Sequence, residues 1–445
     1  MKKTFLLSLL AGTLLYLPFS KLNLWFLAFP VLYLFLKNPS PTFWFVGGYT
    51  FFFLSLRCVN IASVEFGGVN PFLAYLIFSL FSLFLTLYQF LLPLLVWKRF
   101  FEKHLFLLPL FYTGAELLRS YFPYGGFPWL VVGSVVAEFP LLNQSLYHLN
   151  VYFQSLFVLY SLLFLMERKL RRLALLFVFV VFVSLLSYYE KSKKLEKAPS
   201  IRVALVQTAV PQQDKLNPQA FKRHTHRILD LVEEASSKGV DLVILPESAL
   251  AFYYSQDYEE GYDRLMRLSF EAPILVGLVD IREGLKPYNS AYLLKDARTA
   301  GYYDKVRLLP VGEYLPYPFG FLKKVFGAIG GIDYVPGERL EPLRYEPLKV
   351  ATPICFEVAY VDLVERLSED ANLVAVLTND GWFKDSDCAF QHRRWAKVRA
   401  LEVGKYVLWV DNSGYTSVID PFGRVVTSLP YGKRGVLYEE VKLVE

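Results

Sequence analysis

Seven strongly apolar stretches fill about the first 190 residues of this 445-residue chain. A helix needs about 20 apolar residues to cross a bilayer, and several of these stretches are shorter. The whole chain is 54% hydrophobic with a mean hydropathy of +0.33, too apolar for an ordinary soluble protein. The sequence therefore predicts an N-terminal transmembrane α-helical bundle of about seven spans. The stretches run from Phe5 to Phe19, Leu22 to Leu36, Thr42 to Leu56, Phe72 to Trp97, Leu105 to Leu118, Val151 to Met166 and Leu173 to Tyr188.

Lysine and arginine cluster at the ends of these stretches, which is typical of membrane topology signals. The net charge of +6 and the pI of 8.9 therefore do not indicate a nucleic-acid partner. Because the more positive side stays in the cytoplasm, we expect a cytoplasmic N-terminus and, after an odd number of spans, an external C-terminal half. The favoured side holds Lys2, Lys3, Lys37, Lys98, Arg99, Lys103, Arg168, Lys169, Arg171 and Arg172, against Lys21, Arg57 and Arg119 in the opposite loops.

The composition changes after the last apolar stretch. We expect a transmembrane domain over residues 1–189, a charged linker over 190–200 and a second domain over 201–445. In the second domain, β-rich runs such as IRVALVQ, PILVGLVD and YVLWVDN alternate with helical patterns, which favours an α/β layered fold. No GxGxxG or GxxxxGK[ST] motif lies at a strand-helix junction, so nucleotide-dependent chemistry has no support.

The three cysteines, Cys58, Cys355 and Cys388, lie far apart without CxxC or CxxH spacing. This spacing indicates neither a disulfide framework nor a zinc site, and we expect no metal or organic cofactor. A lone reactive thiol remains possible.

The segment after the fifth apolar stretch, RSYFPYGGFPWLVVGSVVAEFP, is too rich in glycine, proline and aromatic residues for a simple helix. Composition leaves two interpretations open. The segment is either an irregular loop that anchors Trp129 at the membrane interface, or a floor at membrane level beneath an active site.

Three side chains that can support covalent chemistry follow short apolar runs of the second domain. Glu247 ends DLVILPE, Lys305 follows AGYYD, and Cys355 ends LKVATPIC. A thiol with a pKa of about 8.5 needs a base to become a nucleophile, and a nearby ammonium stabilises the oxyanion that forms after attack on a carbonyl. Taken singly, each residue is more often structural, since a cysteine at a strand end is usually a small hydrophobe. Their order and their flanking motifs favour a Glu-Lys-Cys triad.

The motifs LPES, DKVRLLPVGEYLP, PICFE and LTNDGWF resemble those of the carbon-nitrogen hydrolase (nitrilase) superfamily. The fusion to N-terminal spans, with GFPWL and RALEVGK, is similar to the bacterial apolipoprotein N-acyltransferase family. The resemblance implies an αββα sandwich with Cys355 as nucleophile, Glu247 as general base and Lys305 as oxyanion stabiliser. It also implies supporting roles for Glu313 and Glu357, and substrate-binding or lid roles for Trp129, Asn379 and Trp382.

The implied reaction is a two-step acyl transfer in the bacterial inner membrane, the last step of lipoprotein maturation. A phospholipid would donate an acyl chain to Cys355, and the α-amino group of a diacylglyceryl apolipoprotein would accept it. A membrane-tethered amidase and an inert scaffold or transporter remain alternatives, because the same triad hydrolyses an amide when water attacks the thioester.

The sequence departs from the family's pattern at two places. Family members commonly have a last span after the nitrilase-like domain, whereas this sequence ends at GVLYEEVKLVE, and many have tyrosine where Phe356 stands. The apolar segment from Tyr314 to Val335 either dips into the outer leaflet to admit acyl chains or packs as core.

Overall fold

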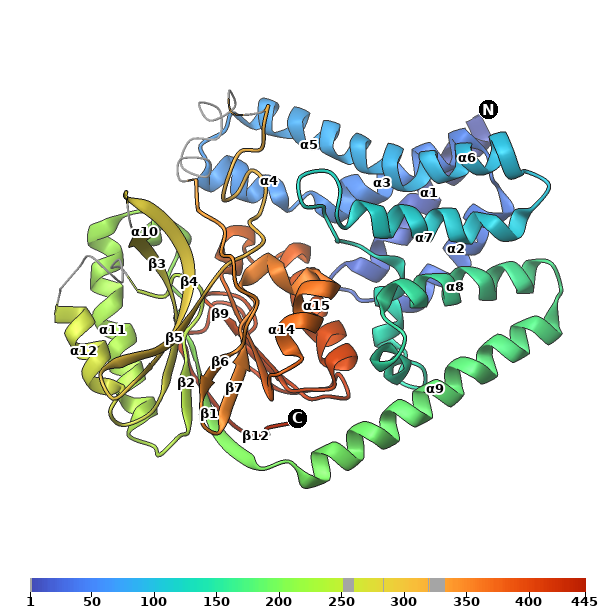
Figure 1. Ribbon diagram of the computed structural model, residues 1–445. Helices are drawn as coiled ribbons and strands as arrows, with labels where there is room; N and C mark the ends of the chain where they lie inside the picture. The colour runs from blue at the N-terminus through green and yellow to red at the C-terminus, as the bar shows by residue number, and fades with distance from the viewer. Residues whose placement is uncertain (1, 251–259, 283, 319, 321–332) are drawn as a thin grey trace. The chain divides into compact units, whose positions relative to one another are not determined.

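The computed structural model describes residues 2–250, 260–282, 284–318, 320 and 333–445 of the chain (Figure 1). Its contacts divide the chain into two compact units. The helical unit consists of residues 1–64, 69–189 and 386–394, and the sheet unit consists of residues 65–68, 190–385 and 395–445.

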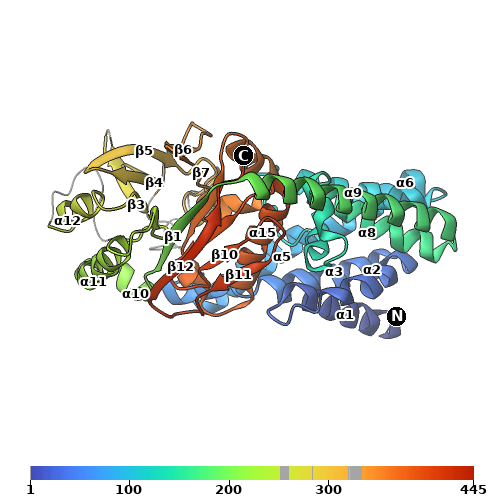
Figure 2. The same cartoon turned by 90° about the horizontal axis from the view of Figure 1, so that it is seen from below.

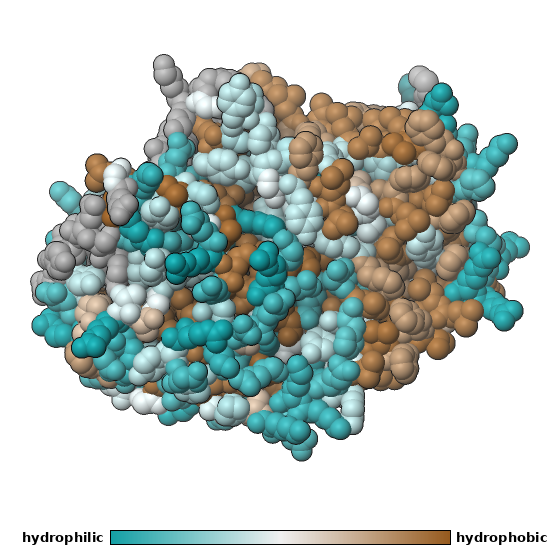
Figure 3. Space-filling model, viewed as in Figure 1, coloured by the Kyte–Doolittle hydropathy of each residue, from teal (hydrophilic) through white to brown (hydrophobic). Residues whose placement is uncertain are grey.

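Each of the seven apolar stretches contains a helix, and apolar side chains cover much of the surface that these helices present in Figure 3. Side chains of Ser40, Asn70 and Asn150 cap the first turns of three of the helices, which is why those helices begin where they do. The helices are α1 (Lys2–Tyr16), α2 (Ala28–Lys37), α3 (Pro41–Leu56), α4 (Val59–Ile61), α5 (Pro71–Thr86), α6 (Leu92–Phe101), α7 (Leu108–Arg119), α8 (Val151–Met166) and α9 (Leu170–Lys197).

The helices of these stretches differ in whether they are long enough to cross a membrane. Within the described part of the chain, Pro71–Phe101 and Leu170–Lys197 are long and apolar enough to cross a membrane. Pro41–Leu56 and Val59–Phe66, which are bent by 51° at their junction, would add a third crossing if they act as one span. The apolar helices Trp25–Lys37 and Val151–Met166 are shorter.

The segment after α7 is an ordered loop that includes two short 3-10 helices, Val132–Glu138 and Asn143–Tyr147. The buried guanidinium of Arg119 donates hydrogen bonds to the carbonyl oxygens of Phe127 (2.7 Å) and Trp129 (2.8 Å). The carboxylate of Glu116 accepts one from the Val132 amide at 2.8 Å. Polar groups of α7 therefore hold the GFPWL loop in place, because buried main-chain groups need such partners.

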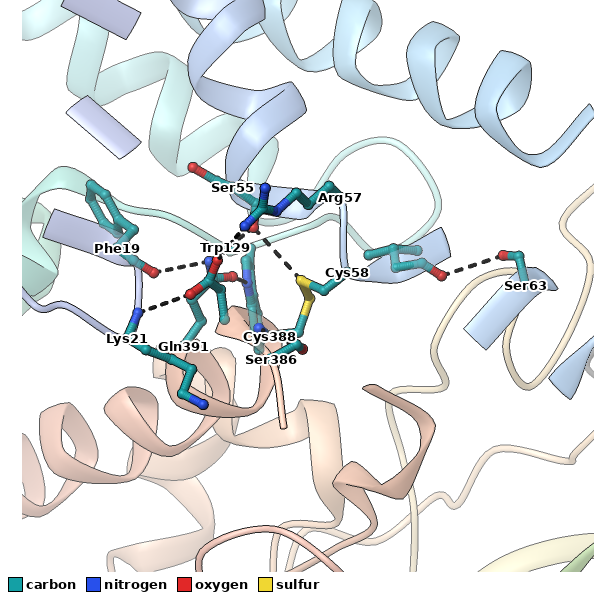
Figure 4. Close-up of a disulfide and its surroundings, with 12 residues drawn as sticks. Phe19, Lys21, Ser55, Arg57, Cys58, Ser63, Trp129, Ser386, Cys388 and Gln391 are labelled. Atoms are coloured by element: carbon teal, nitrogen blue, oxygen red, sulfur yellow. Dashed lines mark hydrogen bonds and ion pairs between the residues drawn. A yellow bond between two sulfur atoms is a disulfide. The ribbon is translucent and has the colours of Figure 1, made fainter. Parts of the chain in front are cut away.

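The cysteine spacing indicated no disulfide, and this interpretation is wrong. Cys58 and Cys388 form a disulfide with their Cα atoms 6.0 Å apart (Figure 4). The two residues are separated by 330 positions, so no local spacing pattern could reveal the pair. Cys388 lies in residues 386–394, which begin helix α15 (Asp387–Val403) and belong to the helical unit.

Hydrogen bonds reinforce this attachment of residues 386–394 beside the disulfide (Figure 4). The side-chain amide of Gln391 donates to the carbonyl oxygens of Phe19 (3.0 Å) and Ser55 (2.9 Å) and accepts from the Trp129 indole at 2.8 Å. Gln391 and Trp129 are both buried, so these bonds satisfy groups that water cannot reach.

The sheet unit contains two six-stranded sheets. The first has the order β12-β1-β2-β3-β4-β5, in which β1, β2 and β3 are parallel, and the second has the order β11-β10-β9-β8-β7-β6, in which β7, β8 and β9 are parallel. The first sheet consists of β1 (Ser200–Gln207), β2 (Leu242–Ile244), β3 (Ile274–Arg282), β4 (Lys286–Lys295), β5 (Arg298–Asp304) and β12 (Gly435–Lys442). The second consists of β6 (Leu343–Tyr345), β7 (Leu348–Ala351), β8 (Leu373–Thr378), β9 (Val407–Asp411), β10 (Ser417–Ile419) and β11 (Val425–Ser428).

Helices cover the outer faces of the two sheets, as Figures 1 and 2 show, and this gives the expected αββα layers. Helices α11 (Pro218–Ser236) and α12 (Glu260–Leu268) lie on the first sheet, and α14 (Val361–Ser368) and α15 lie on the second. Strands such as β8 and β9 are buried along their whole length, which explains their continuous apolar sequence. The predicted strands and helices recur here, including β5, which ends in the AGYYD run before Lys305, whereas β6 and β11 were not predicted.

We expect Gly12→Ala to destabilise the helical unit. A Cβ atom at Gly12 of α1 would lie 2.3 Å from the Gly47 carbonyl oxygen of α3, so the two helices would have to separate. Such overpacking costs about 1–3 kcal/mol. The melting temperature in detergent measures the effect. Gly114→Ala in α7 is the matched control, because a Cβ there meets no atom within 4 Å, and equal melting temperatures for the two variants would contradict the packing argument.

The disulfide predicts a definite count of reactive thiols. After denaturation without reductant, iodoacetamide should add to Cys355 alone, since the other two cysteines are bonded to each other. After reduction, all three cysteines should react. Intact-protein mass spectrometry gives the count directly, and three adducts before reduction would show that the bond is absent.

Candidate active site

Strand ends from both sheets supply the candidate catalytic side chains. Glu247 follows β2 and Lys305 directly follows β5 in the first sheet, whereas Cys355 follows β7 in the second. Lys305 is almost completely buried, and Glu247 is 8% exposed. In α/β folds, functional groups gather at strand ends, because loops there are free to carry polar side chains.

The Lys305 ammonium is surrounded by carboxylates. Its Nζ atom lies 2.9 Å from Glu313 and 3.8 Å from Oε1 of Glu247. Glu313 is in turn fixed by the Leu309 amide, which donates to its Oε2 at 2.8 Å. A buried ammonium without such partners would be strongly destabilising, so the carboxylates explain how the lysine is accommodated.

Asn289 of β4 joins the two carboxylates. Its Nδ2 donates to Oε1 of Glu247 at 2.7 Å and to Oε1 of Glu313 at 2.9 Å. Its main-chain carbonyl also accepts from the Lys305 amide at 2.9 Å. One residue therefore sets the relative positions of Glu247, Glu313 and the start of the Lys305 loop.

Cys355 begins a short 3-10 helix, Cys355–Ala359, and has a positive φ of 54°. Residues other than glycine rarely adopt this conformation, which costs about 1–3 kcal/mol and is typical of functional sites. The thiol is free. The left-handed turn breaks the extended chain at the cysteine, directly after the isolated bridge of Ile354 with Leu377 of β8.

Glu357 holds the main chain on both sides of the site. Its buried carboxylate accepts hydrogen bonds from the amides of Val306 (2.7 Å), Arg307 (2.9 Å) and Ile354 (2.8 Å), and from the Tyr303 hydroxyl (3.0 Å). These donors come from the Lys305 loop and from the residue before Cys355. A single carboxylate thus connects the two sheets at the site.

Burial and neighbouring charges shift the pKa values of Lys305 and Cys355. Burial opposes the Lys305 charge, but the neighbouring carboxylates, with Glu313 the largest contributor, outweigh it and raise the lysine pKa. Burial, followed by the charge of Glu247, raises the Cys355 pKa well above its ordinary value, although Lys305 acts in the opposite direction. The resting site therefore holds an ammonium and a protonated thiol.

The loop after β8 lies in the electrostatic neighbourhood of Cys355, because the charge of Asp380 contributes to the raised thiol pKa. Asn379, one residue earlier, donates to Gln212 at 3.0 Å and accepts from Asn412 at 2.9 Å. Trp382 is half-buried and contacts Phe66 edge to face, with ring centroids 5.7 Å apart.

The remaining sequence predictions fall elsewhere. Trp129 lies in the helical unit, with its indole on Gln391. Most of the segment from Tyr314 to Val335 lies outside the described residues. Among the residues that the structure describes, no group of three or more His, Cys, Asp or Glu side chains is placed to hold a metal ion.

Sequence reasoning missed Asn289 and Tyr303. Asn289 is a polar residue directly before the β-rich run SAYLLK, and this position was the available signal. Tyr303 gave no such signal, because tyrosine is common in strands.

Glu357 predicts a pH dependence of stability. Burial raises its pKa to about 7 from 4.5, although hydrogen bonds from main-chain amides act against this. Because the folded pKa is raised, its contribution is fully present below about pH 4.5 and is lost as pH rises through about 7, a loss of about 3 kcal/mol.

Between pH 4.5 and pH 7.5, the melting temperature of Glu357→Gln should therefore fall by less than that of the native chain. Melting curves at these two pH values measure the difference. Glu369→Gln, an exposed change at the end of α14, is the control and should behave like the native chain. Equal pH slopes for native and Glu357→Gln would contradict the prediction.

Sequence comparisons identify both halves of the chain. Residues 202–445 match the carbon-nitrogen hydrolase family, and residues 11–164 match the apolipoprotein N-acyltransferase N-terminal domain. A solved carbon-nitrogen hydrolase from Helicobacter pylori G27 is 18% identical with a TM-score of 0.41, and the similarity covers 55% of this chain and 90% of that one.

Full-length relatives carry both halves. The apolipoprotein N-acyltransferase of Aquifex aeolicus is 43% identical over 98% of this chain and 98% of its own. That of Haemophilus ducreyi is 28% identical over 89% of this chain and 81% of its own. The chain therefore belongs to the apolipoprotein N-acyltransferase family, within the carbon-nitrogen hydrolases.

Proposed function

We propose that this chain transfers an acyl chain from a membrane phospholipid to the α-amino group of the diacylglyceryl-cysteine that begins an apolipoprotein. The acyl chain passes through a thioester on Cys355. The observation that carries the proposal is the Lys305 ammonium, held between Glu247 and Glu313 and electrostatically coupled to the free Cys355 thiol. Family membership supports an apolipoprotein acceptor, since the relatives are named apolipoprotein N-acyltransferase.

In the first half-reaction, Glu247 takes the Sγ–H proton of Cys355 as the sulfur attacks the acyl ester carbonyl. Because the thiol pKa is raised, the proton is present until the base removes it. The Lys305 ammonium stabilises the oxyanion. The C–O bond then breaks, the lysophospholipid oxygen receives the proton from Glu247, and the thioester remains.

In the second half-reaction, the α-amino group of the acceptor attacks the thioester carbonyl. Glu247 takes a proton from the attacking amine, and Lys305 again stabilises the oxyanion. The C–S bond breaks, an amide forms, and the thiol regains its proton. Glu313 and Glu357 position Lys305 and the Cys355 turn, since they hold the main chain of these segments.

The proposal assigns Asn379, Trp382 and Trp129 to substrate access. Asp380 lies between Asn379 and Trp382 in the chain, and its charge acts on the Cys355 thiol, which supports a lid role for this loop. Trp129 is fixed through its carbonyl by Arg119 and through its indole by Gln391, which supports a rigid binding element.

We further propose seven spans with the sheet unit on the external side of the inner membrane. The distribution of lysine and arginine supports this orientation. The disulfide supports it independently, because Cys58 follows the third predicted span and Cys388 follows the seventh, so both cysteines would lie outside. Disulfides form and persist in such oxidising compartments.

Membrane confinement supports a lipid reaction. A donor and an acceptor that are both lipid-anchored meet at one membrane surface, where their effective concentration is high. The exposed apolar side chains of α5 and α9 provide the corresponding lipid-facing surface.

The first test is intact-protein mass spectrometry after incubation with phospholipid alone. The native chain should gain one acyl mass that hydroxylamine removes, and Cys355→Ala should gain none. A labile acyl mass on Cys355→Ala, or none on the folded native chain with several phospholipids, would contradict the proposal.

The acceptor is tested by adding a diacylglyceryl lipopeptide with a free N-terminal amine to the acylated protein. The acyl mass should move from protein to peptide, and an N-acetylated peptide is the matched control that should leave the thioester in place. Loss of the acyl mass to water at the same rate with both peptides would favour an amidase-like hydrolase instead.

A further inference from the structure

The partly buried ammonium of Lys215 is directed at the main chain that carries Glu247. Lys215 ends the short helix α10 (Gln212–Lys215), which follows β1. Its Nζ donates to the Ser248 carbonyl oxygen at 2.8 Å and to that of Glu247 at 3.3 Å. The ammonium also lies 5.5 Å from the centroid of the Phe221 ring.

The turn that receives this ammonium is strained. Ser248 has a positive φ of 47°, a conformation that costs a residue other than glycine about 1–3 kcal/mol. Two successive carbonyl oxygens, those of Glu247 and Ser248, point to one cation instead of to a neighbouring strand. An ammonium has three donors, so it can satisfy both carbonyls at once.

Strand β3 confines the same turn from another direction. A Cβ atom at Gly277 would lie 2.5 Å from the Pro246 carbonyl oxygen and 2.7 Å from the Glu247 Cα atom, so only glycine allows this approach. The Ala249 amide donates to the Gly277 carbonyl at 2.8 Å. Strand β3 therefore confines the Glu247 backbone on one side. Lys215 holds the same backbone through the carbonyl oxygens of Glu247 and Ser248.

This main-chain position sets the carboxylate of Glu247. Its Oε1 must accept from Asn289 at 2.7 Å while lying 3.8 Å from the Lys305 ammonium. A displacement of about 1 Å at a reacting group can cost about 10²-fold in rate. The carbonyl contacts of Lys215 thus bear on the chemistry through the position of the Glu247 carboxylate.

Helix α10 also contacts the loop after β8. Gln212, at the other end of α10, accepts a hydrogen bond from Asn379 at 3.0 Å. The helix is anchored by Asp214, whose carboxylate lies 2.8 Å from Nε2 of His224. Since Arg434 donates to Nδ1 of the same ring, Nε2 of the neutral ring carries the proton that binds Asp214.

Burial lowers the Lys215 pKa to about 8, and the charges of Glu247 and Asp411 act against this decrease. The side chain is therefore mainly an ammonium at neutral pH, which is compatible with its two carbonyl contacts. Its neighbours are thus a carboxylate, a second acid and main-chain oxygens, all of which favour the charged form.

We propose that Lys215 is a positioning residue that holds the Glu247–Ser248 turn, and through it the base, in the geometry required for thioester formation. The inference rests on the proposed role of Glu247 as base. It predicts that the effect of Lys215 on the reaction passes through Glu247 and not through substrate binding.

The test is a double-mutant cycle on thioester formation, measured as the burst of p-nitrophenolate when the purified full-length chain reacts with p-nitrophenyl butyrate. Lys215→Met should lower the maximal burst rate constant about tenfold or more, with an unchanged half-saturating ester concentration. Lys215→Arg should restore part of the rate, because a guanidinium can donate to both carbonyls. Lys238→Met, at an exposed lysine of the sheet unit, is the matched control and should react like the native chain.

The decisive arm repeats Lys215→Met in the Glu247→Gln background. If Lys215 acts through Glu247, the second substitution should change the remaining rate by less than about twofold. A full tenfold loss in that background, a native rate for Lys215→Met, or a rise in half-saturating ester without loss of maximal rate would overturn the inference. Melting temperatures of all variants separate these outcomes from unfolding.

Failure of the proposed function gives a different result. If the native chain gives no burst and no acyl mass with phospholipid, the thioester mechanism is wrong. If the native chain gives both and Lys215→Met matches it, only the inference about Lys215 is wrong.

Discussion

The Lys305 ammonium carries a full positive charge at a position that water hardly reaches, and the groups around it stabilise that charge. An ammonium in such a position is stable only when carboxylates neutralise it, and Glu313 at 2.9 Å and Glu247 at 3.8 Å do so. Asn289 then donates to both carboxylates and orients them relative to each other. The same pairing keeps the lysine charged, as the proposed stabilisation of an oxyanion requires.

The excess of negative charge around this lysine has a second consequence. Burial and Glu247 raise the Cys355 pKa, so this side chain is held as a thiol. A stored thiol is less open to oxidation than a thiolate, which suits a protein whose other two cysteines form a disulfide. In the proposed reaction, the thiolate forms when Glu247 takes the proton during attack.

Main-chain geometry at the site is held by charged side chains. Cys355 and Ser248 both adopt left-handed conformations, which are unfavourable for side chains with a Cβ atom. Glu357 satisfies amides on both sides of the Cys355 turn, and Lys215 satisfies carbonyls of the Ser248 turn. The two strained turns are thus stabilised by opposite charges, each matched to the main-chain groups that the turn leaves unpaired.

The sequence by itself determined that the seven apolar stretches form helices. It also determined that strands and helices alternate after them, because apolar periodicity reflects local structure directly. It also placed Glu247, Lys305 and Cys355 after β-rich runs, and its ordered motifs indicated the family. Only the tertiary structure decided which distant residues meet. Cys58 and Cys388, 330 positions apart, Asn289 between two carboxylates, and Lys215 on the Glu247 turn are contacts between segments whose approach depends on sheet order and packing. Local sequence patterns do not encode such distances, whereas the folded chain fixes them.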